Sequence, residues 1–128
     1  MALRDKLRVM VVDDTSTSRG LITQALDTFG IKNVSATSDG PSAIIEIERS
    51  PVHLVISDYN MPDMNGLELL KRLRSAPKTK GVGFILITGK ADKAIIDQGR
   101  ALGMNNFIKK PFDVGGLQNC IEAVVGRI

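Results

Sequence analysis

The chain has 128 residues, of which 43% are hydrophobic and 24% charged, as in an ordinary soluble domain. A net charge of +3 and only 4% aromatic residues give no argument for a nucleic-acid partner. No apolar stretch approaches the roughly 20 residues that span a bilayer, and the single Cys120 cannot form an internal disulfide. We therefore expect one cytoplasmic, monomeric domain over residues 1–128, with no membrane contact and no separate output domain.

The first half of the chain predicts two strands and two helices. A strand is expected at 9–12, where apolar residues follow one another, and a helix follows it and stops at Gly30. A second strand at 33–37 alternates polar and apolar residues, and Asp39-Gly40-Pro41 begins a second helix. Helical spacing puts these residues on the inner faces of the two helices: Leu21, Ile22, Ala25, Leu26 and Phe29 in the first, and Ala43, Ile44 and Ile47 in the second.

The second half predicts three more strands, each followed by a helix. Strands are expected at 54–57, 83–87 and 106–109, and a helix at about 91–102. Asn65 can cap a helix that follows the strand at 54–57, and Asp113 can cap the last helix of the chain. The expected inner faces are Leu67, Leu70 and Leu73, then Ile95, Ile96 and Leu102, then Leu117, Ile121, Val124, Val125 and Ile128.

Five strands alternating with five helices predict a single α/β domain whose parallel sheet is covered by helices on both faces. The strongly apolar strands at 9–12, 54–57 and 83–87 suit the buried centre of the sheet, whereas the mixed strands suit its edges. This favours the strand order 2-1-3-4-5 with right-handed crossovers, which is the doubly wound, flavodoxin-like arrangement. Such sheets bind ligands beyond the carboxyl ends of their strands.

Polar side chains stand where four of these strands end. Asp13 and Asp14 follow the first strand, Asp58 the third, Thr88 the fourth and Lys110 the fifth. Any one of them has a simpler explanation as a helix cap or a solvated side chain, but their coincidence at one rim favours a shared site. Three carboxylates stay ionised together only when a cation joins them, and oxygen ligands without nearby His or Cys favour Mg²⁺.

We therefore predict a magnesium-assisted phosphoryl site at this rim. Asp58 is the expected nucleophile, because an aspartate can accept a phosphoryl group as an acyl phosphate. Thr88 and Lys110 are expected to bind the phosphoryl oxygens, since phosphoryl transfer depends on positioning and charge neutralisation. The expected Mg²⁺ ligands are Asp13, Asp14, Asp58 and a backbone carbonyl near Asn60.

At these residues the chain resembles the receiver domain of two-component response regulators, and it is most similar to the single-domain chemotaxis regulators of the CheY type. The matching segments run along the whole chain: Val12-Asp13-Asp14, Ser57-Asp58-Tyr59-Asn60-Met61-Pro62, Asn65-Gly66, Ile87-Thr88-Gly89 and Lys110-Pro111-Phe112. The resemblance implies that a sensor histidine kinase donates the phosphoryl group to Asp58. It also implies a cis Lys110–Pro111 peptide bond and a switch, in which Thr88 moves toward the phosphoryl group and Phe107 turns inward.

The resemblance further implies a partner surface on the fourth helix, fifth strand and fifth helix. In CheY-type proteins this surface binds the kinase and the flagellar motor switch protein, and here it carries Lys90, Lys93 and Lys109. Phe107 lacks the hydroxyl of a tyrosine, so the switch would act by packing alone. Such a protein is a signalling module rather than an enzyme, because it catalyses only its own phosphorylation and dephosphorylation.

Two alternatives share the same chemistry. The protein could be a phosphate sink or a phosphorelay intermediate, neither of which requires a motor partner. A phosphohydrolase with an aspartate nucleophile is more remote, because Asp13-Asp14-Thr15 lacks the Asp-x-Asp spacing of haloacid-dehalogenase-like enzymes and the chain has no cap domain.

Overall fold

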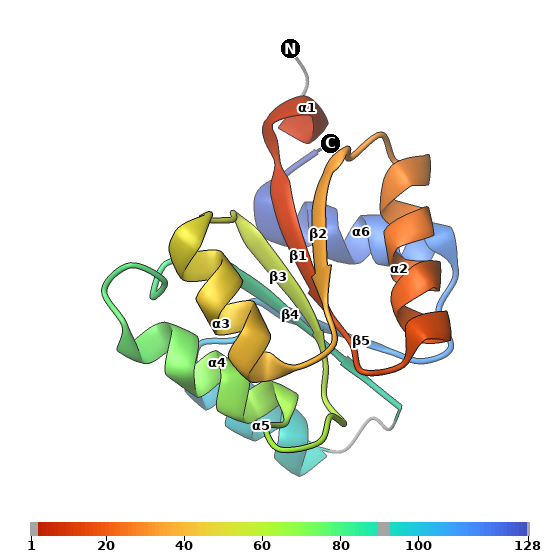
Figure 1. The fold of residues 1–128 in the computed structure, drawn as a ribbon. Coiled ribbons are helices and arrows are strands. Elements are labelled where there is room, and N and C mark those ends of the chain that lie inside the picture. The colour runs from red at the N-terminus through yellow and green to blue at the C-terminus, as the bar shows by residue number, and fades with distance from the viewer. Residues whose placement is uncertain (1–2, 90–92, 128) are drawn as a thin grey trace.

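A computed structural model describes residues 3–89 and 93–127 of the chain (Figure 1). The strands are β1 Arg8–Val12, β2 Asn33–Thr37, β3 Leu54–Asp58, β4 Gly83–Thr88 and β5 Asn106–Lys109. The helices are α1 Leu3–Lys6, α2 Ser16–Thr28, α3 Gly40–Arg49, α4 Gly66–Ser75, α5 Lys93–Ala101 and α6 Val114–Val125. Strands and helices alternate from β1 to α6, as the sequence predicts.

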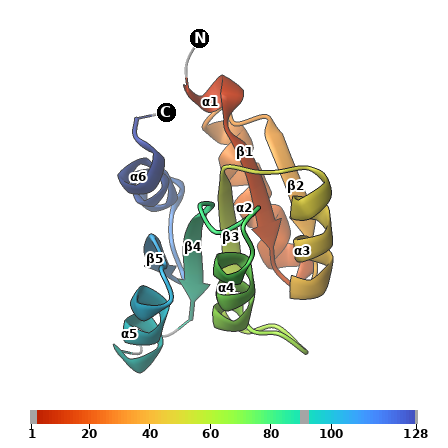
Figure 2. The ribbon, with the colours of Figure 1, turned by 90° about the vertical axis from the view of Figure 1, so that its left-hand side faces the viewer.

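The five strands form one parallel sheet in the predicted order β2-β1-β3-β4-β5, which Figure 2 shows from right to left. Every residue of β3 is buried, and β1 and β4 are buried apart from their first residues. The edge strands β2 and β5 keep partly exposed residues along their length. The apolar strands are central because helices cover both faces of a parallel sheet. Since all strands run the same way, their carboxyl ends lie along one edge.

Two hydrophobic cores, one on each face of the sheet, hold the helices in place. Helices α2 and α6 cover one face, and α3, α4 and α5 cover the other (Figure 1). Alternate residues of β1 serve the two cores: Val9 and Val11 belong to the α2–α6 core, and Met10 and Val12 to the α3–α5 core. This alternation follows from the period of two in a strand. Because both faces of β1 are buried, its pairing register is fixed, and with it the position of the residues that follow Val12.

Residues 3–89 and 93–127 form six helices, one more than the five predicted. The additional helix, α1, has only four residues and no buried side chain, so it gives no helical periodicity that the sequence could reveal. Residues 90–92, which include the predicted start of α5 and Lys90, lie outside the described residues, as does Ile128. None of the helices in residues 3–89 and 93–127 is long and apolar enough to cross a membrane.

One predicted inner residue faces outward. Helical spacing places Leu21 on the inner face of α2, but the structure leaves 62% of it exposed. Ile22, Ala25 and Leu26 supply the buried stripe of this helix. Leu21 lies about 100° around the helix from Ile22, on the side away from Leu26, so it falls at the solvent border of that stripe.

The caps predicted for two helices are confirmed. The Asn65 side chain accepts a hydrogen bond from the Glu68 N–H over 2.9 Å, and the Glu68 carboxylate accepts one from the Asn65 N–H over 3.1 Å. This reciprocal capping box begins α4 close behind β3. Asp113 likewise accepts from the Gly116 N–H over 2.6 Å at the start of α6. Both caps fix the direction in which the chain leaves the carboxyl edge of the sheet.

Candidate functional site

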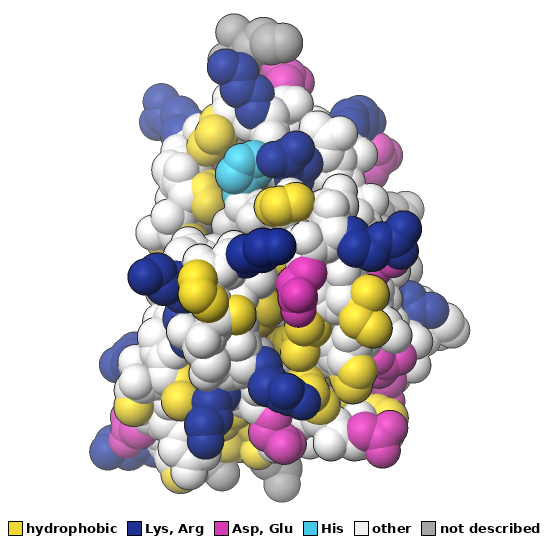
Figure 3. Space-filling model, turned by 60° about the vertical axis from the view of Figure 1, so that its left-hand side comes forward, with side chains coloured by type: hydrophobic (Ala, Val, Ile, Leu, Met, Phe, Trp, Pro, Cys, Tyr) yellow, Lys and Arg dark blue, Asp and Glu magenta, His cyan; other side chains and the backbone are white. Residues whose placement is uncertain are grey.

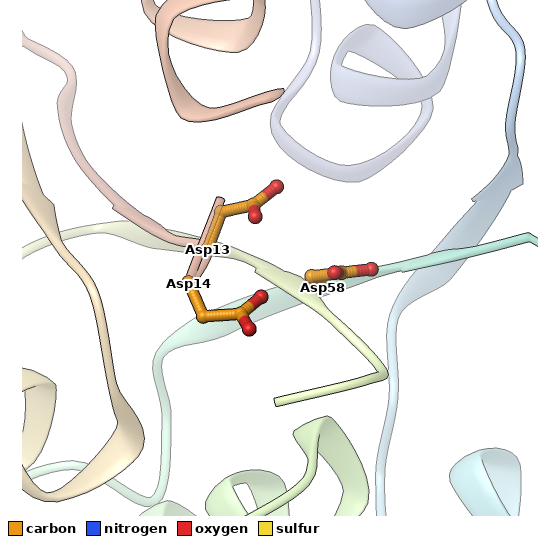
Figure 4. A group of neighbouring side chains, drawn as sticks. All are labelled: Asp13, Asp14 and Asp58. Carbon is orange, nitrogen blue, oxygen red and sulfur yellow. The ribbon is translucent and has the colours of Figure 1, made fainter. Parts of the chain in front are cut away.

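Three aspartates meet at the carboxyl edge of the sheet (Figure 4). Asp13 and Asp14 follow β1 directly, and Asp58 is the last residue of β3. Since β1 and β3 are neighbouring parallel strands with Val12 opposite Ser57, both strands deliver their acids to one place. One carboxylate oxygen from each aspartate lies within 4.8 Å of the others. In Figure 4 the Asp14 carboxylate extends toward Asp58.

Asp13 is fully buried and is held by the first turn of α2. Its Oδ1 accepts the Thr15 N–H over 2.9 Å, and its Oδ2 accepts the Ser18 hydroxyl over 2.6 Å. Its main-chain carbonyl accepts Arg19 Nη1 over 2.7 Å. Buried carboxylates require such donors, because burial removes the water that would otherwise stabilise the charge. Asp14, in contrast, is exposed to solvent.

Lys110 brings a positive charge to this cluster. Its Nζ lies 3.5 Å from Asp58 Oδ1 and 3.9 Å from Asp13 Oδ2. The Lys110 N–H donates to the Thr88 carbonyl over 2.8 Å, which ties the end of β5 to that of β4. The Lys110–Pro111 peptide bond is cis, as the resemblance implies. The structure therefore brings residues from three different strand ends within reach of one another.

The electrostatic environment of Asp58 favours its neutral form. Burial raises the pKa of the Asp58 carboxyl above its ordinary value, because only 7% of the residue is exposed to water. The nearby charge of Lys110 lowers this pKa, and the charge of Asp13 raises it. The net direction is upward, so an ionised Asp58 is held at a cost that an additional cation would offset.

Thr88 lies on β4, the strand next to that of Asp58, and Phe107 lies on β5, one strand further along the sheet. Thr88 ends β4 with 2% of its surface exposed, one residue beyond Ile87, which is the register partner of Asp58. Phe107 lies on β5 opposite Leu86 and packs, partly buried, against the α3–α5 core. Thr88 thus reaches the same edge as the acids, whereas Phe107 lies on the edge strand β5 and packs against the core on one face of the sheet.

The loop after Asp58 folds back tightly onto the strand. The Gly66 N–H donates to the Tyr59 carbonyl over 2.9 Å, which closes the loop that contains the exposed Asn60. A Cβ on Gly66 would lie 2.6 Å from both the Asp58 carbonyl oxygen and Leu86 Cδ1. Only glycine allows the first turn of α4 to approach Asp58 this closely.

A hollow of about 780 Å³ opens beside Lys110, between the first turns of α2 and α6. Ser18 and Leu21 line it from α2, Phe112 lines it from the β5–α6 connection, and Val114 lines it from the start of α6. Leu21 and Val114 are among the few large apolar side chains of the described residues that are more than a third exposed. The hollow gives a ligand access to the Lys110 side of the site.

The donor set fits a hard divalent cation. Three carboxylates from two strands converge, and the described residues of this cluster include no His or Cys ligand. Mg²⁺ takes one or two carboxylates together with water and phosphate oxygens, which suits an open rim with one exposed acid. With such a cation, the buried Asp58 carboxylate could act as a nucleophile toward a phosphoryl group while Lys110 faces the transferred oxygens.

Sequence reasoning identified the acids and Lys110 but missed Ser18 and Arg19. Both lie in the first turn of α2, where polar residues are ordinary and give no distinct pattern. The only available signal was the segment from Thr15 to Arg19, five polar residues directly after two acids. Polar residues at the start of a helix are more often explained as caps, so this signal alone does not single out Ser18.

Comparison with known proteins gives a consistent result. The response regulator receiver domain family matches residues 9–122. "Probable chemotaxis protein CheY" of Rhizobium etli is 39% identical over 128 residues, which is 100% of this chain and 99% of that protein. The solved structure of chemotaxis response regulator CheY4 of Vibrio cholerae gives a TM-score of 0.85 at 27% identity, over 92% of this chain and 98% of that one.

A more distant solved structure shares the fold. It is the receiver domain of sensor histidine kinase PA1611 from Pseudomonas aeruginosa, which has a magnesium ion coordinated in its active site cleft. The TM-score is 0.84 at 23% identity, over 94% of this chain and 98% of that one. At this identity the comparison establishes the common fold.

Replacing Gly66 by alanine should destabilise the protein by about 1–3 kcal/mol, because the new methyl group meets the Asp58 carbonyl. Gly20→Ala is the matched control: Gly20 lies inside α2 with nothing within 4 Å of a Cβ, so alanine should stabilise by roughly 0.5–1 kcal/mol. Urea unfolding measures both free energies. Equal stability of the two variants would contradict the close approach at Gly66.

Asp58→Asn should raise the melting temperature by a few degrees at pH 7 without divalent cations. A raised folded-state pKa means that the native state binds more protons than the unfolded state, so stability falls as pH rises from about 3.9 toward that folded pKa. The variant lacks this loss, and its advantage should shrink as pH is lowered through that folded pKa toward about 3.9. Calorimetric melts measure the difference. Asp63→Asn, at an exposed position of the same loop, should behave like wild type; a less stable Asp58→Asn would refute the electrostatic account.

Proposed function

We propose that Asp58 accepts a phosphoryl group from a sensor histidine kinase, because the chain belongs to the family of response regulator receiver domains, which are phosphorylation-switched signalling modules. One observation carries the assignment of the residues. Acids from the ends of β1 and β3 converge within 4.8 Å, and Lys110 Nζ lies 3.5 Å from Asp58. The proposal includes the cytoplasmic location expected from the sequence.

Each residue of the rim has a separate task in this proposal. Asp58 Oδ attacks phosphorus and becomes an acyl phosphate, while the bond from phosphorus to the histidine nitrogen of the donor breaks. Lys110 and Thr88 bind the oxygens of the transferred group. When bound, Mg²⁺ would neutralise charge on the acids and on the phosphoryl oxygens. Its proposed ligands are Asp13, Asp14, Asp58 and the backbone carbonyl of Asn60.

The readout proposed for phosphorylation is a change in packing between β4, β5 and α5. Thr88 is buried at the end of β4 and Phe107 lies on the adjacent strand, so a shift of Thr88 toward the phosphoryl group would vacate space near the ring. Phe107 has no hydroxyl to report its position by a hydrogen bond. The two arrangements must therefore differ in buried apolar contact, and phosphorylation would bias their equilibrium.

The proposed partner is the flagellar motor switch protein, bound through the surface of α5, β5 and α6. Of its predicted lysines, Lys109 is exposed and Lys93 forms an exposed ion pair with Asp97 over 3.2 Å. Exposed ion pairs such as Lys93–Asp97 contribute little energy, so recognition through the surface of α5, β5 and α6 would depend on shape as much as on charge. A different side of the molecule, around α3 and α4, has basic and acidic side chains interspersed (Figure 3).

Phosphorylation is tested by mass spectrometry. The protein incubated with acetyl phosphate and Mg²⁺ should gain one phosphoryl group per chain, and chelation of Mg²⁺ should prevent the gain. Asp58→Asn should remove this gain entirely, because Asp58, the last residue of β3, is the proposed nucleophile. Asp63→Asn, five residues along in the same loop, is the matched control and should label like wild type. Persistent labelling of Asp58→Asn would overturn the assignment of the nucleophile.

Partner binding separates the motor regulator from a phosphate sink. The phosphorylated protein should bind a peptide of the flagellar motor switch protein at least several-fold more tightly than the unphosphorylated protein, as measured by fluorescence anisotropy. Lys109→Ala should weaken this binding, whereas Lys78→Ala, exposed beyond the end of α4, should leave it unchanged. A phosphorylated protein that does not bind the peptide would favour the sink or relay role.

A further inference from the structure

We infer that Ser18 is a positioning residue for Asp13, and that its hydroxyl fixes the orientation in which Asp13 meets a divalent cation. The inference rests on the proposed function, because it concerns the metal that the acid cluster would hold. It adds a residue of α2 to a site otherwise built from strand ends. The observation behind it is the 2.6 Å hydrogen bond from Ser18 Oγ to Asp13 Oδ2.

The two oxygens of Asp13 have different partners. Oδ1 accepts the Thr15 N–H, a bond that belongs to the turn between β1 and α2 and does not depend on any side chain but that of Asp13. Oδ2 accepts the Ser18 hydroxyl at 2.6 Å, whereas Lys110 Nζ lies at 3.9 Å, beyond ordinary hydrogen-bond distance. Ser18 therefore makes the short contact on the oxygen of Asp13 that faces the Lys110 side of the cluster.

Ser18 is not explained as a helix cap. The N-cap of α2 is Thr15, and Ser18 lies two residues inside the helix, which begins at Ser16. A serine in a helix usually bonds a nearby main-chain group or water. Here the hydroxyl instead reaches a carboxylate in the connection before the helix. Arg19 adds a bond to the Asp13 carbonyl, so consecutive residues hold both the side chain and the main chain of the same acid.

The expected consequence follows from the role of outer partners at metal sites. A carboxylate that is held by hydrogen bonds from outer partners enters the metal shell already oriented, and loss of such a partner typically lowers metal affinity about 10–100-fold. Without the hydroxyl, Asp13 keeps the Thr15 N–H but can rotate its free oxygen away from the cluster. Ser18 also lines the hollow beside Lys110, so a slightly larger hydroxyl residue has room there.

The test compares Mg²⁺ affinity in three variants by isothermal titration calorimetry. Fluorescence of Tyr59, the only tyrosine in a chain without tryptophan, is a second readout beside Asp58. Ser18→Ala should weaken Mg²⁺ binding about 10-fold. Ser18→Thr, which keeps a hydroxyl, should restore affinity to near the wild-type value. Ser16→Ala, an exposed serine of the same helix turn, is the control and should bind like wild type.

The outcomes separate this inference from the proposed function. Melting in the absence of Mg²⁺ verifies that each variant is folded, since a purely structural role would lower stability without a selective loss of metal affinity. If the wild-type protein binds Mg²⁺ and the affinity of Ser18→Ala lies within about twofold of the wild-type affinity, the inference is overturned but the proposed function stands. A failure of Ser18→Thr to restore binding would overturn it as well. A wild-type protein that shows neither heat nor fluorescence change with Mg²⁺ would overturn the proposed function and the inference together.

Discussion

Repulsion among three carboxylates at one edge of the sheet is the constraint around which this structure is arranged. Asp13, Asp14 and Asp58 carry oxygens within 4.8 Å of one another, and two of these acids are buried. Burial raises the pKa of Asp58 because water is excluded from it, and Lys110 only partly offsets that effect. The site is therefore poised to gain stability from a cation, and a transferred phosphoryl group would add charge that the cation and Lys110 could balance.

The parallel sheet makes this concentration of charge possible. A hydrophobic core on each face fixes the register of the central strands. The acids at the ends of these strands are therefore held close together. The acids are attached to the most buried part of the fold, whereas the groups that complete the site come from connections. Lys110 follows an edge strand, and Gly66 lets the loop after Asp58 fold back against it. Rigid strands hold the acids in place, which suits the phosphorylation-switched signalling of the receiver family.

Signal transmission in this fold depends on how a local charge change reaches a distant surface. Thr88 and Phe107 occupy adjacent strands, and Phe107 is partly buried and packs against the α3–α5 core. Any movement of the ring must repack neighbouring apolar side chains, which occurs in discrete arrangements because protein interiors are closely packed. In the proposed switch, Phe107 has no tyrosine hydroxyl, so the energetic difference between the two arrangements would lie in apolar contact.

The sequence by itself determined the strand order, the acids at the strand ends and the helix caps at Asn65 and Asp113. These features depend on local patterns: apolar runs mark central strands, and capping side chains act within three residues. Only the tertiary structure decided that Leu21 faces outward, that α1 is helical and that Ser18 bonds Asp13. Periodicity cannot choose between neighbouring positions at the border of a helix face, and four residues are too few to show it. The Ser18 contact exists because α2 packs against β1 at one rotation, which is set by the whole core rather than by the residues that make the contact.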